Sequence, residues 1–258
     1  MPRKTLKRIS AAIPLLVLWG FPALAQDTWT WPAKPSNVQV LPKDMPASQL
    51  RSVMTQFAST LGVRCSYCHK GEEGKPLSAY DFVSDENPNK DRAREMLRML
   101  KDINAHLSKL QPSGDQRINM WCHTCHHGKP RPITLEEALM EQYRAKGIQA
   151  TLDRYAELRK QYYGRDAYDF GEGSLNAVGY LVLEKDSAGA IRVLELNAKL
   201  FPQSGNVWDS LGEACLKAGD QKRAEESYEK SLTLDPTNEN AKDVLKKIRV
   251  SREKSQPQ

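Results

Sequence analysis

The 258-residue sequence lacks the patterns of a β-sheet protein and of a membrane-spanning one. It has no convincing run of alternating apolar residues, which argues against a sheet and predicts an all-α fold. Its most apolar stretch, Ile13 to Leu24, is shorter than the roughly 20 residues of a membrane-spanning helix and is broken by Gly20 and Pro22. No cysteine follows this stretch, so a lipid anchor at this place is not supported.

An excess of charge is also missing once the first 25 residues are set aside. Residues 1–25 combine a basic start, the apolar stretch and a small-residue end, Ala23-Leu24-Ala25, which predicts a cleaved secretory signal. This segment carries four positive charges, so the formal net charge of +6 falls to about +2 (6 − 4). The pI near 9.0 is therefore no sign of a nucleic-acid partner. We expect a bacterial periplasmic protein, and association with the outer face of the inner membrane is compatible with this.

What the sequence does contain is the five-residue string Cys-x-x-Cys-His, twice: Cys65–His69 and Cys122–His126. This string is the attachment signature of a c-type haem, because both thiols and the histidine share one turn of helix. We expect two haems, held covalently by Cys65 and Cys68 and by Cys122 and Cys125, with His69 and His126 as axial ligands of the iron.

Other uses of these cysteines explain less of the pattern. A single zinc ion on the four cysteines would leave both following histidines without a role, and such sites favour a reducing compartment. Disulfides or a thioredoxin-like dithiol are weaker still, because no βαβ pattern surrounds either string. The fifth cysteine, Cys215, falls at a core position of a helix and is expected to be buried.

The sixth ligand of each iron is less determined by the residues. A helix is predicted from near Asp44 to Gly62, and Met54 lies on its apolar face, eleven residues before Cys65. Met54 can therefore be a ligand of the first haem or an ordinary core residue. A second helix is predicted over residues 91–110, where three side chains could reach an iron: Met96, Met99 and His106.

Several polar or apolar residues close to the strings have other expected roles. Met120 is too near Cys122 to reach the opposite face of the haem, and His123 and His127 point away from the haem that His126 serves. They are expected to be surface residues or ligands elsewhere. Four cations near the strings could neutralise haem propionates or belong to a solvated surface: Arg64, Lys70, Arg92 and Arg94.

The C-terminal part contains a helical repeat. Residues 206–236 have tetratricopeptide spacings, and Asp186 and Asp220 match across a 34-residue period. A leading helical pair over 134–163 begins with a predicted capping box at Thr134 and Glu137. We divide the chain into a signal (1–25), a dihaem segment (26–133), linking helices (134–170), repeats with a capping helix (171–249) and a polar tail (250–258).

Residues 38–132 resemble the cytochrome c subunit of photosynthetic reaction centres. The likeness lies in VQVLPKDMPASQLRSVMTQFASTLGVRCSYCHKG, NPNKDRAREMLRMLKDIN and MWCHTCHHGKPRP, in this order. In that family most haems take a methionine from the helix before their own string, which implies Met54 for the first haem and Met99 for the second. The family subunit has four haems and commonly a lipid-anchored N-terminus, whereas this chain has strings for two haems.

A haem with histidine and methionine ligands has no free coordination site, so the expected function is transfer of single electrons to and from a redox partner protein. The repeats are expected to dock a peptide or protein. Two alternatives stay open: a haem enzyme, such as a peroxidase or small reductase with one open distal site, and a repeat scaffold in which the haems only stabilise the fold.

Overall fold

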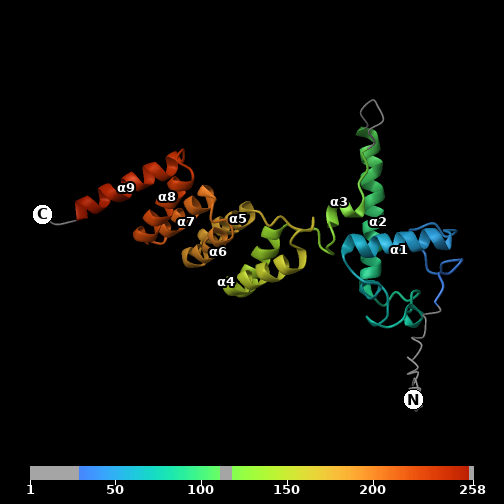
Figure 1. Ribbon diagram of the computed structural model, residues 1–258. Coiled ribbons are helices and arrows are strands. Elements are labelled where there is room, and N and C mark those ends of the chain that lie inside the picture. Colours follow the sequence, from blue (N-terminus) through green and yellow to red (C-terminus); the bar gives the residue numbers. More distant parts are fainter. Residues whose placement is uncertain (1–28, 111–117, 256–258) are drawn as a thin grey trace, which may run out of the picture.

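The computed structural model describes residues 29–110 and 118–255 (Figure 1). All regular structure in these residues is helical, apart from one isolated bridge between Lys70 and Asp81. The predicted all-α fold is therefore confirmed. No helix within the described ranges is long and apolar enough to cross a membrane. The predicted signal, residues 1–25, lies outside the described residues.

Helix α1 (Ala47–Leu61) precedes the first string. It begins after Pro46 and ends at Gly62, whose positive φ of 64° is the left-handed conformation that a helix C-cap favours. An added Cβ at Gly62 would lie 2.2 Å from the carbonyl oxygen of Gly128. Glycine is required here because the backbone just before the first string comes into direct contact with the backbone just after the second. The first string itself forms a short 3₁₀ turn, η1 (Cys65–Tyr67).

Helix α2 (Pro88–Leu107) and its 3₁₀ extension η3 (Ser108–Leu110) precede the second string. The helix begins three residues before the predicted start, because the side chain of Asn87 accepts a hydrogen bond from the backbone N–H of Asn89 and Pro88 occupies the first turn. Helix α3 (Cys122–His126) is the second string, and it contacts α1. The remaining short turn of this segment is η2 (Leu77–Ala79).

Helix α4 (Leu135–Tyr162) is interrupted at Gly147, which has φ 77° and ψ −173°. It therefore consists of two helices joined by one glycine. The predicted capping box is confirmed: the Thr134 backbone N–H donates to the Glu137 carboxylate at 2.9 Å, and the Glu137 N–H donates to the Thr134 hydroxyl at 3.2 Å.

The repeats form two antiparallel pairs, α5 (Glu172–Leu183) with α6 (Ser187–Leu200) and α7 (Gly205–Lys217) with α8 (Gln221–Leu234). Asp186 and Asp220 cap the second helix of each pair by accepting hydrogen bonds from backbone N–H groups. Gly212 lets the ring of Tyr228 approach the α7 backbone, since an added Cβ would lie 3.0 Å from that ring. Cys215 is fully buried, as predicted.

The last helix, α9 (Glu239–Ser255), contradicts the predicted tail. The helix was expected to end near Arg249, but it continues to Ser255. Arg249 pairs with Glu229 at 2.8 Å, and Arg252 pairs with Glu225, so the polar residues of the expected tail include a partner for α8. A polar composition was read as a frayed end, whereas tertiary ion pairs extend the helix.

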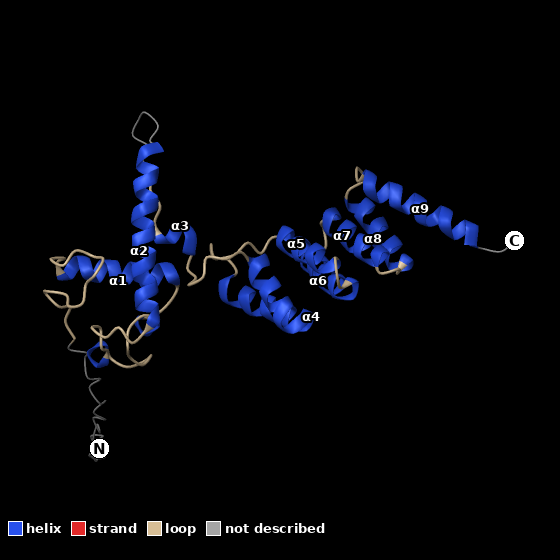
Figure 2. Ribbon diagram, turned by 180° about the vertical axis from the view of Figure 1, so that it is seen from behind, coloured by secondary structure: helices blue, strands red, loops and turns tan. Residues whose placement is uncertain are grey.

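Buried apolar side chains are distributed very unevenly along the chain. One continuous core runs from α4 to α9. Within the described residues before Leu135, only Met45 and Leu50 are buried apolar side chains. The molecule is elongated, with α1, α2 and α3 at one end and α9 at the other (Figure 2).

Candidate haem sites

The first string lies at a cavity of about 330 Å³. Its volume is in the range of roughly 300–1,000 Å³ that is typical of cofactor and ligand sites. Cys65, Cys68 and His69 line this cavity, and so does Met54 from α1. The cavity wall is otherwise mainly apolar and comes chiefly from four parts of the chain: the lead-in before α1 (Trp29, Trp31, Val38, Val40, Leu41), α1 (Leu50, Phe57, Ala58, Leu61), the segment between the first string and α2 (Leu77, Phe82, Val83), and α2 (Ala93, Leu97).

His69 is in a chemical state suited to bind iron. Burial, and then the positive charge of Lys90, lowers the pKa of His69 to about 4, so its ring is neutral at pH 7. Its Nδ1 atom is buried and has no hydrogen-bond partner among the described residues. The ring of Phe82 packs edge-on against the His69 ring, with 5.0 Å between the ring centroids. A neutral, half-buried imidazole that lines one cavity with two thiols and a thioether fits a c-type haem.

The lead-in before α1 is part of this site, which the sequence did not indicate. The sequence placed these residues in the dihaem segment, but gave no role to those before α1. In the structure Trp29 and Trp31 lie edge to face with 4.8 Å between centroids, and Trp29 packs on Phe82. Two tryptophans within three residues could have indicated this role, because large aromatic side chains usually pack against other apolar groups and are rare in solvated linkers.

The cations near the first string are largely occupied by protein partners. Arg94 is buried and pairs with Asp91 and Asp85, so it is not part of a solvated surface. Lys90, which sequence reasoning missed, also lines the cavity and donates hydrogen bonds to the carbonyl groups of Phe82, Val83 and Ser84.

Asp85 is the shared acceptor of this cationic network. The hydrogen bond from Arg94, and then the one from Lys90, lowers the pKa of Asp85 to about 2. Of the other three expected cations, Arg64 lines the cavity and pairs with Glu73, Lys70 pairs with Glu86, and Arg92 donates to Asn89. The network therefore holds residues 82–85 against α2.

The second string is built differently. The Nδ1 atom of His126 lies 3.0 Å from the carbonyl oxygen of Lys129 and donates to it, which leaves Nε2 free for a metal. Upstream, the Asn104 side chain bonds both the backbone N–H of Met120 at 2.8 Å and its carbonyl at 2.9 Å. The bond to Lys129 fixes the tautomer of His126, and the two bonds of Asn104 attach the chain just before the string to α2.

The expected distal ligands of the second haem are exposed. Met96 and Met99 are 45% and 48% exposed, whereas Met54 is partly buried. Met99 and His106 line one open hollow along α2, and Met96 does not. Cys122, Cys125 and His126 do not line this hollow. The structure thus brings Met54 together with its string and does not do so for Met99, Met96 or His106.

Apolar side chains are exposed in the chain before the second string. Trp121 is 67% exposed, and Ile118 and Leu110 are exposed as well. A porphyrin attached to Cys122 and Cys125 would cover apolar surface next to the string.

The cysteines do not gather around one metal ion. Within residues 29–110 and 118–255, the group of three or more His, Cys, Asp or Glu side chains close enough to hold a metal is His123, His127 and Asp166. It contains no cysteine. A Cys₄ zinc site is therefore not formed, and each string keeps its own histidine.

The cavity, the paired thiols and the neutral histidine define a c-type cytochrome. Residues 22–161 match the family described as photosynthetic reaction centre cytochrome C subunit, and the chain belongs to this family. The match covers more than residues 38–132, on which the resemblance was based, and includes nearly all of α4.

Further comparisons concern parts of the chain. Cytochrome c-554 of Chloroflexus aurantiacus is 40% identical over 98 residues, which are 38% of this chain and 21% of that protein. The chain thus matches about one fifth of the length of this relative. The first tetratricopeptide domain of Spaghetti (RPAP3) bound to an HSP90 peptide is 20% identical, covering 45% of this chain and 89% of that one, with a TM-score of 0.33. The same domain of human RPAP3 in solution is 21% identical, covering 47% and 94%, with a TM-score of 0.33.

Proposed function

We propose that the protein is an exported dihaem c-type cytochrome that carries single electrons and does not catalyse a reaction of its own. The observation that carries this proposal is the cavity at the first string, which Met54, Cys65, Cys68 and His69 line together. Haem supplies one-electron transfer at its iron, and its potential depends on the axial ligands, burial and neighbouring charges.

In this proposal the protein residues fix the cofactor and protect it. Cys65 and Cys68 would attach it, His69 and Met54 would hold the iron, and the mainly apolar wall would exclude water. A methionine ligand raises the potential relative to two imidazoles. With both axial positions taken, no place remains for a substrate on the first iron.

The second haem would be attached by Cys122 and Cys125 with His126 as its proximal ligand. Membership of the family supports Met99 as the distal ligand, because Met99 occupies the matching place in the Met-Leu-x-Met motif of α2. Met99 also lines the open hollow on α2, which Met96 does not, but no residue of the second string lines this hollow. His106 lines the same hollow, although its Nδ1 already lies 2.9 Å from the carbonyl oxygen of Asp102.

The direct test is a pyridine haemochrome count combined with a redox titration of the purified protein. We expect two haems per chain and two one-electron waves, both at potentials typical of methionine ligation. A count of zero, or a protein that contains zinc in place of iron, would overturn the proposal. A count of one would limit it to the first site.

A haem enzyme is the second candidate, and the exposure of Met96 and Met99 is the observation that favours it. An iron whose distal side is solvent-exposed can bind small ligands. Carbon monoxide added to the ferrous protein separates the two functions: an electron carrier binds it little or slowly, and an enzyme binds one equivalent rapidly. The His126 haem would then be the reactive one.

The repeat stack is proposed to dock the redox partner. Helices α5 and α7 contact each other, and their shared face carries three carboxylates: Glu172, Asp209 and Glu213. This charge favours a basic partner surface. Replacing Asp209 with Asn and Glu213 with Gln keeps the shape of these side chains. At low salt the variant should receive electrons from the periplasmic side of source membranes more slowly than the parent protein does. At high salt the two proteins should have the same rate. A variant that receives electrons as fast as the parent protein at both salt concentrations would contradict docking on this face.

A further inference from the structure

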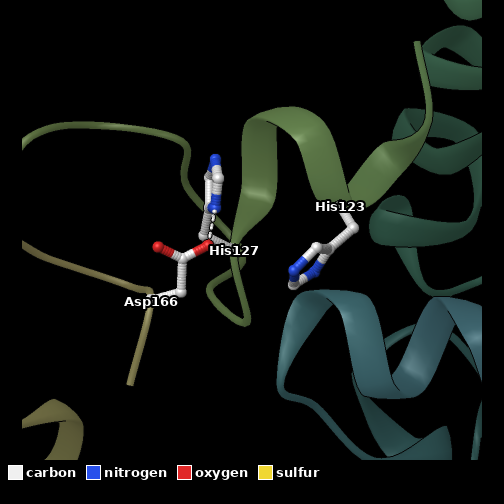
Figure 3. A group of neighbouring side chains, drawn as sticks. All are labelled: His123, His127 and Asp166. Carbon is white, nitrogen blue, oxygen red and sulfur yellow. Dashed lines mark hydrogen bonds and ion pairs between the residues drawn. The ribbon is translucent and has the colours of Figure 1, made fainter. Parts of the chain in front are cut away.

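Two histidines that the haem sites do not use lie beside an aspartate from a distant part of the chain. His123 is inside α3, His127 directly follows its end, and Asp166 belongs to the segment between α4 and α5 (Figure 3). Their potential ligand atoms all lie within 4.8 Å of one another. His123 lies within the second string, His127 directly follows it, and Asp166 is 39 residues away from His127 in sequence. The fold, not the motif, brings them together.

We propose that His123, His127 and Asp166 bind one divalent transition-metal ion of the Zn²⁺ type. Two imidazole nitrogens and one carboxylate oxygen are a donor set that zinc accepts in sites with three protein ligands and one open position. Such a site would be separate from both haems, because none of its residues is an expected iron ligand.

His127 is held in an orientation that suits a metal ligand. Its backbone is in the left-handed region, with φ 47°, where it forms the C-cap of α3 and donates its N–H to the carbonyl oxygen of His123. Its Nε2 donates to the carbonyl oxygen of Thr124 at 2.8 Å, and its Nδ1 points at the Asp166 carboxylate at 2.7 Å. A backbone carbonyl on the far nitrogen is the usual means by which a protein fixes a histidine ligand.

His123 is free to complete the site. Its side chain is exposed, and its ring nitrogens make no hydrogen bond with any other described residue; its ring lies 5.4 Å from that of His127, centroid to centroid. Ligand atoms around tetrahedral zinc are roughly 3.3 Å apart, given metal–ligand bonds of about 2.0–2.1 Å. The exposed Asp166 carboxylate, 2.7 Å from His127 Nδ1, must therefore move slightly away from that nitrogen, and the exposed His123 side chain must rotate inward. No buried group has to move.

The nearby cation does not compete for this position. Lys129 is buried, but its Nζ donates to the carbonyl oxygen of Ala167 and lies 4.0 Å from the centre of the Tyr168 ring. The same short segment, residues 166–168, thus already contacts the haem segment through Lys129. A bound ion would add a second link between α3 and this segment, and would limit the movement of the repeats relative to the second haem.

The test is isothermal titration of the full-length, haem-loaded protein with Zn²⁺. We expect one ion per chain, with unchanged haem absorbance. His123→Ala and Asp166→Asn should each weaken binding at least about tenfold, because even residues that only orient a metal ligand contribute 10–100-fold. Asp243→Asn, which removes the same charge from an exposed position on α9, is the matched control and should bind as the parent does.

Hydrogen exchange gives an independent measurement. Zn²⁺ should slow exchange in residues 163–170 of the parent protein and have no such effect in His123→Ala. Binding without 1:1 saturation, or equal affinity in the parent and both site variants, would overturn the proposal and indicate adventitious surface binding. A change in the haem spectrum on adding Zn²⁺ would also count against it, since the ion would then act at an iron ligand.

Discussion

The haem segment and the repeat stack contain helices of similar length but obtain their stability in different ways. From α4 to α9, side chains of neighbouring helices form one continuous buried core. In the described residues before Leu135, Met45 and Leu50 are the buried apolar side chains, and the first string lines a cavity of about 330 Å³.

This difference shows what a covalent cofactor does for a small segment. About 90 residues can barely bury a sufficient core from their own side chains. Here the place of that core is taken by a cavity with two thiols at its wall. The repeats need no cofactor, because each helix pair buries its apolar face against the next pair.

Removing the first haem should have the largest effect. In the double variant Cys65→Ser, Cys68→Ser the cavity would be left empty, at a cost of up to roughly 8 kcal/mol for 330 Å³ at about 24 cal/mol per Å³. This is comparable to the whole stability of many domains. We expect α1 and α2 to lose hydrogen-exchange protection, while α5 to α8 keep theirs.

The matched variant Cys122→Ser, Cys125→Ser should leave α1 and the first haem in place, since the second string lies outside the cavity. If both variants unfolded to the same extent, the two sites would not differ as described. If the repeats unfolded with α1, the two regions would form one cooperative unit.

Met54→Ala should have the next largest effect, and it compares the two haem sites directly. Loss of the thioether opens the first iron, so the methionine charge-transfer band of that haem should disappear and ferrous carbon monoxide binding should rise by one equivalent. Met99→Ala should do the same at the second haem, with Met96→Ala as its control on the same helix. Loss of the band in Met96→Ala instead would reassign the ligand.

Gly62→Ala should destabilise the contact between the two strings. The alanine would adopt a left-handed φ of 64°, and its Cβ would meet the Gly128 carbonyl oxygen at 2.2 Å, so we expect a loss of roughly 2–4 kcal/mol in unfolding free energy. Gly74→Ala is the control: its φ is 87°, but nothing lies within 4 Å of the added atom. Gly74→Ala should lower the free energy of unfolding, measured with denaturant, by roughly 1 kcal/mol. An equal decrease for Gly62→Ala and Gly74→Ala would exclude the clash with Gly128.

The acid response of the haem segment should be the smallest effect. The pKa of Asp85 is lowered from 3.8 to about 2, so its contribution to stability is complete above pH 4 and is lost as the pH falls towards 2. Asp85→Asn should therefore flatten the decrease in stability of this segment between pH 4 and 2, measured by thermal unfolding. Asp243→Asn should leave the pH dependence unchanged, and a similar flattening there would point to general charge repulsion.

Much of the fold could be predicted because its signals are local. Gly62 ends α1, Thr134 and Glu137 form the capping box, and Cys215 is buried, all as the local pattern indicated. The end of α9 was wrong because Arg252 gains its partner, Glu225, from another helix. Composition cannot show a contact between residues 27 positions apart.

In the haem sites, too, the local features could be predicted from the sequence and the tertiary contacts could not. The strings themselves, with Cys65, Cys68, His69, Cys122, Cys125 and His126, are readable because covalent attachment needs fixed spacing within one turn. That Trp29 and Lys90 belong to the first site, and that the buried Arg94 pairs with Asp85, depended on how distant segments meet.

The sequence by itself determined the helices, the repeat and the two attachment strings, because each depends on residues within one or two turns of each other. The tertiary structure alone decided that Met54 faces its string across a cavity while Met99 lies on an open face. It also decided that Asp166 meets His127. These outcomes depend on the packing of separate segments, and no local spacing encodes the distance between them.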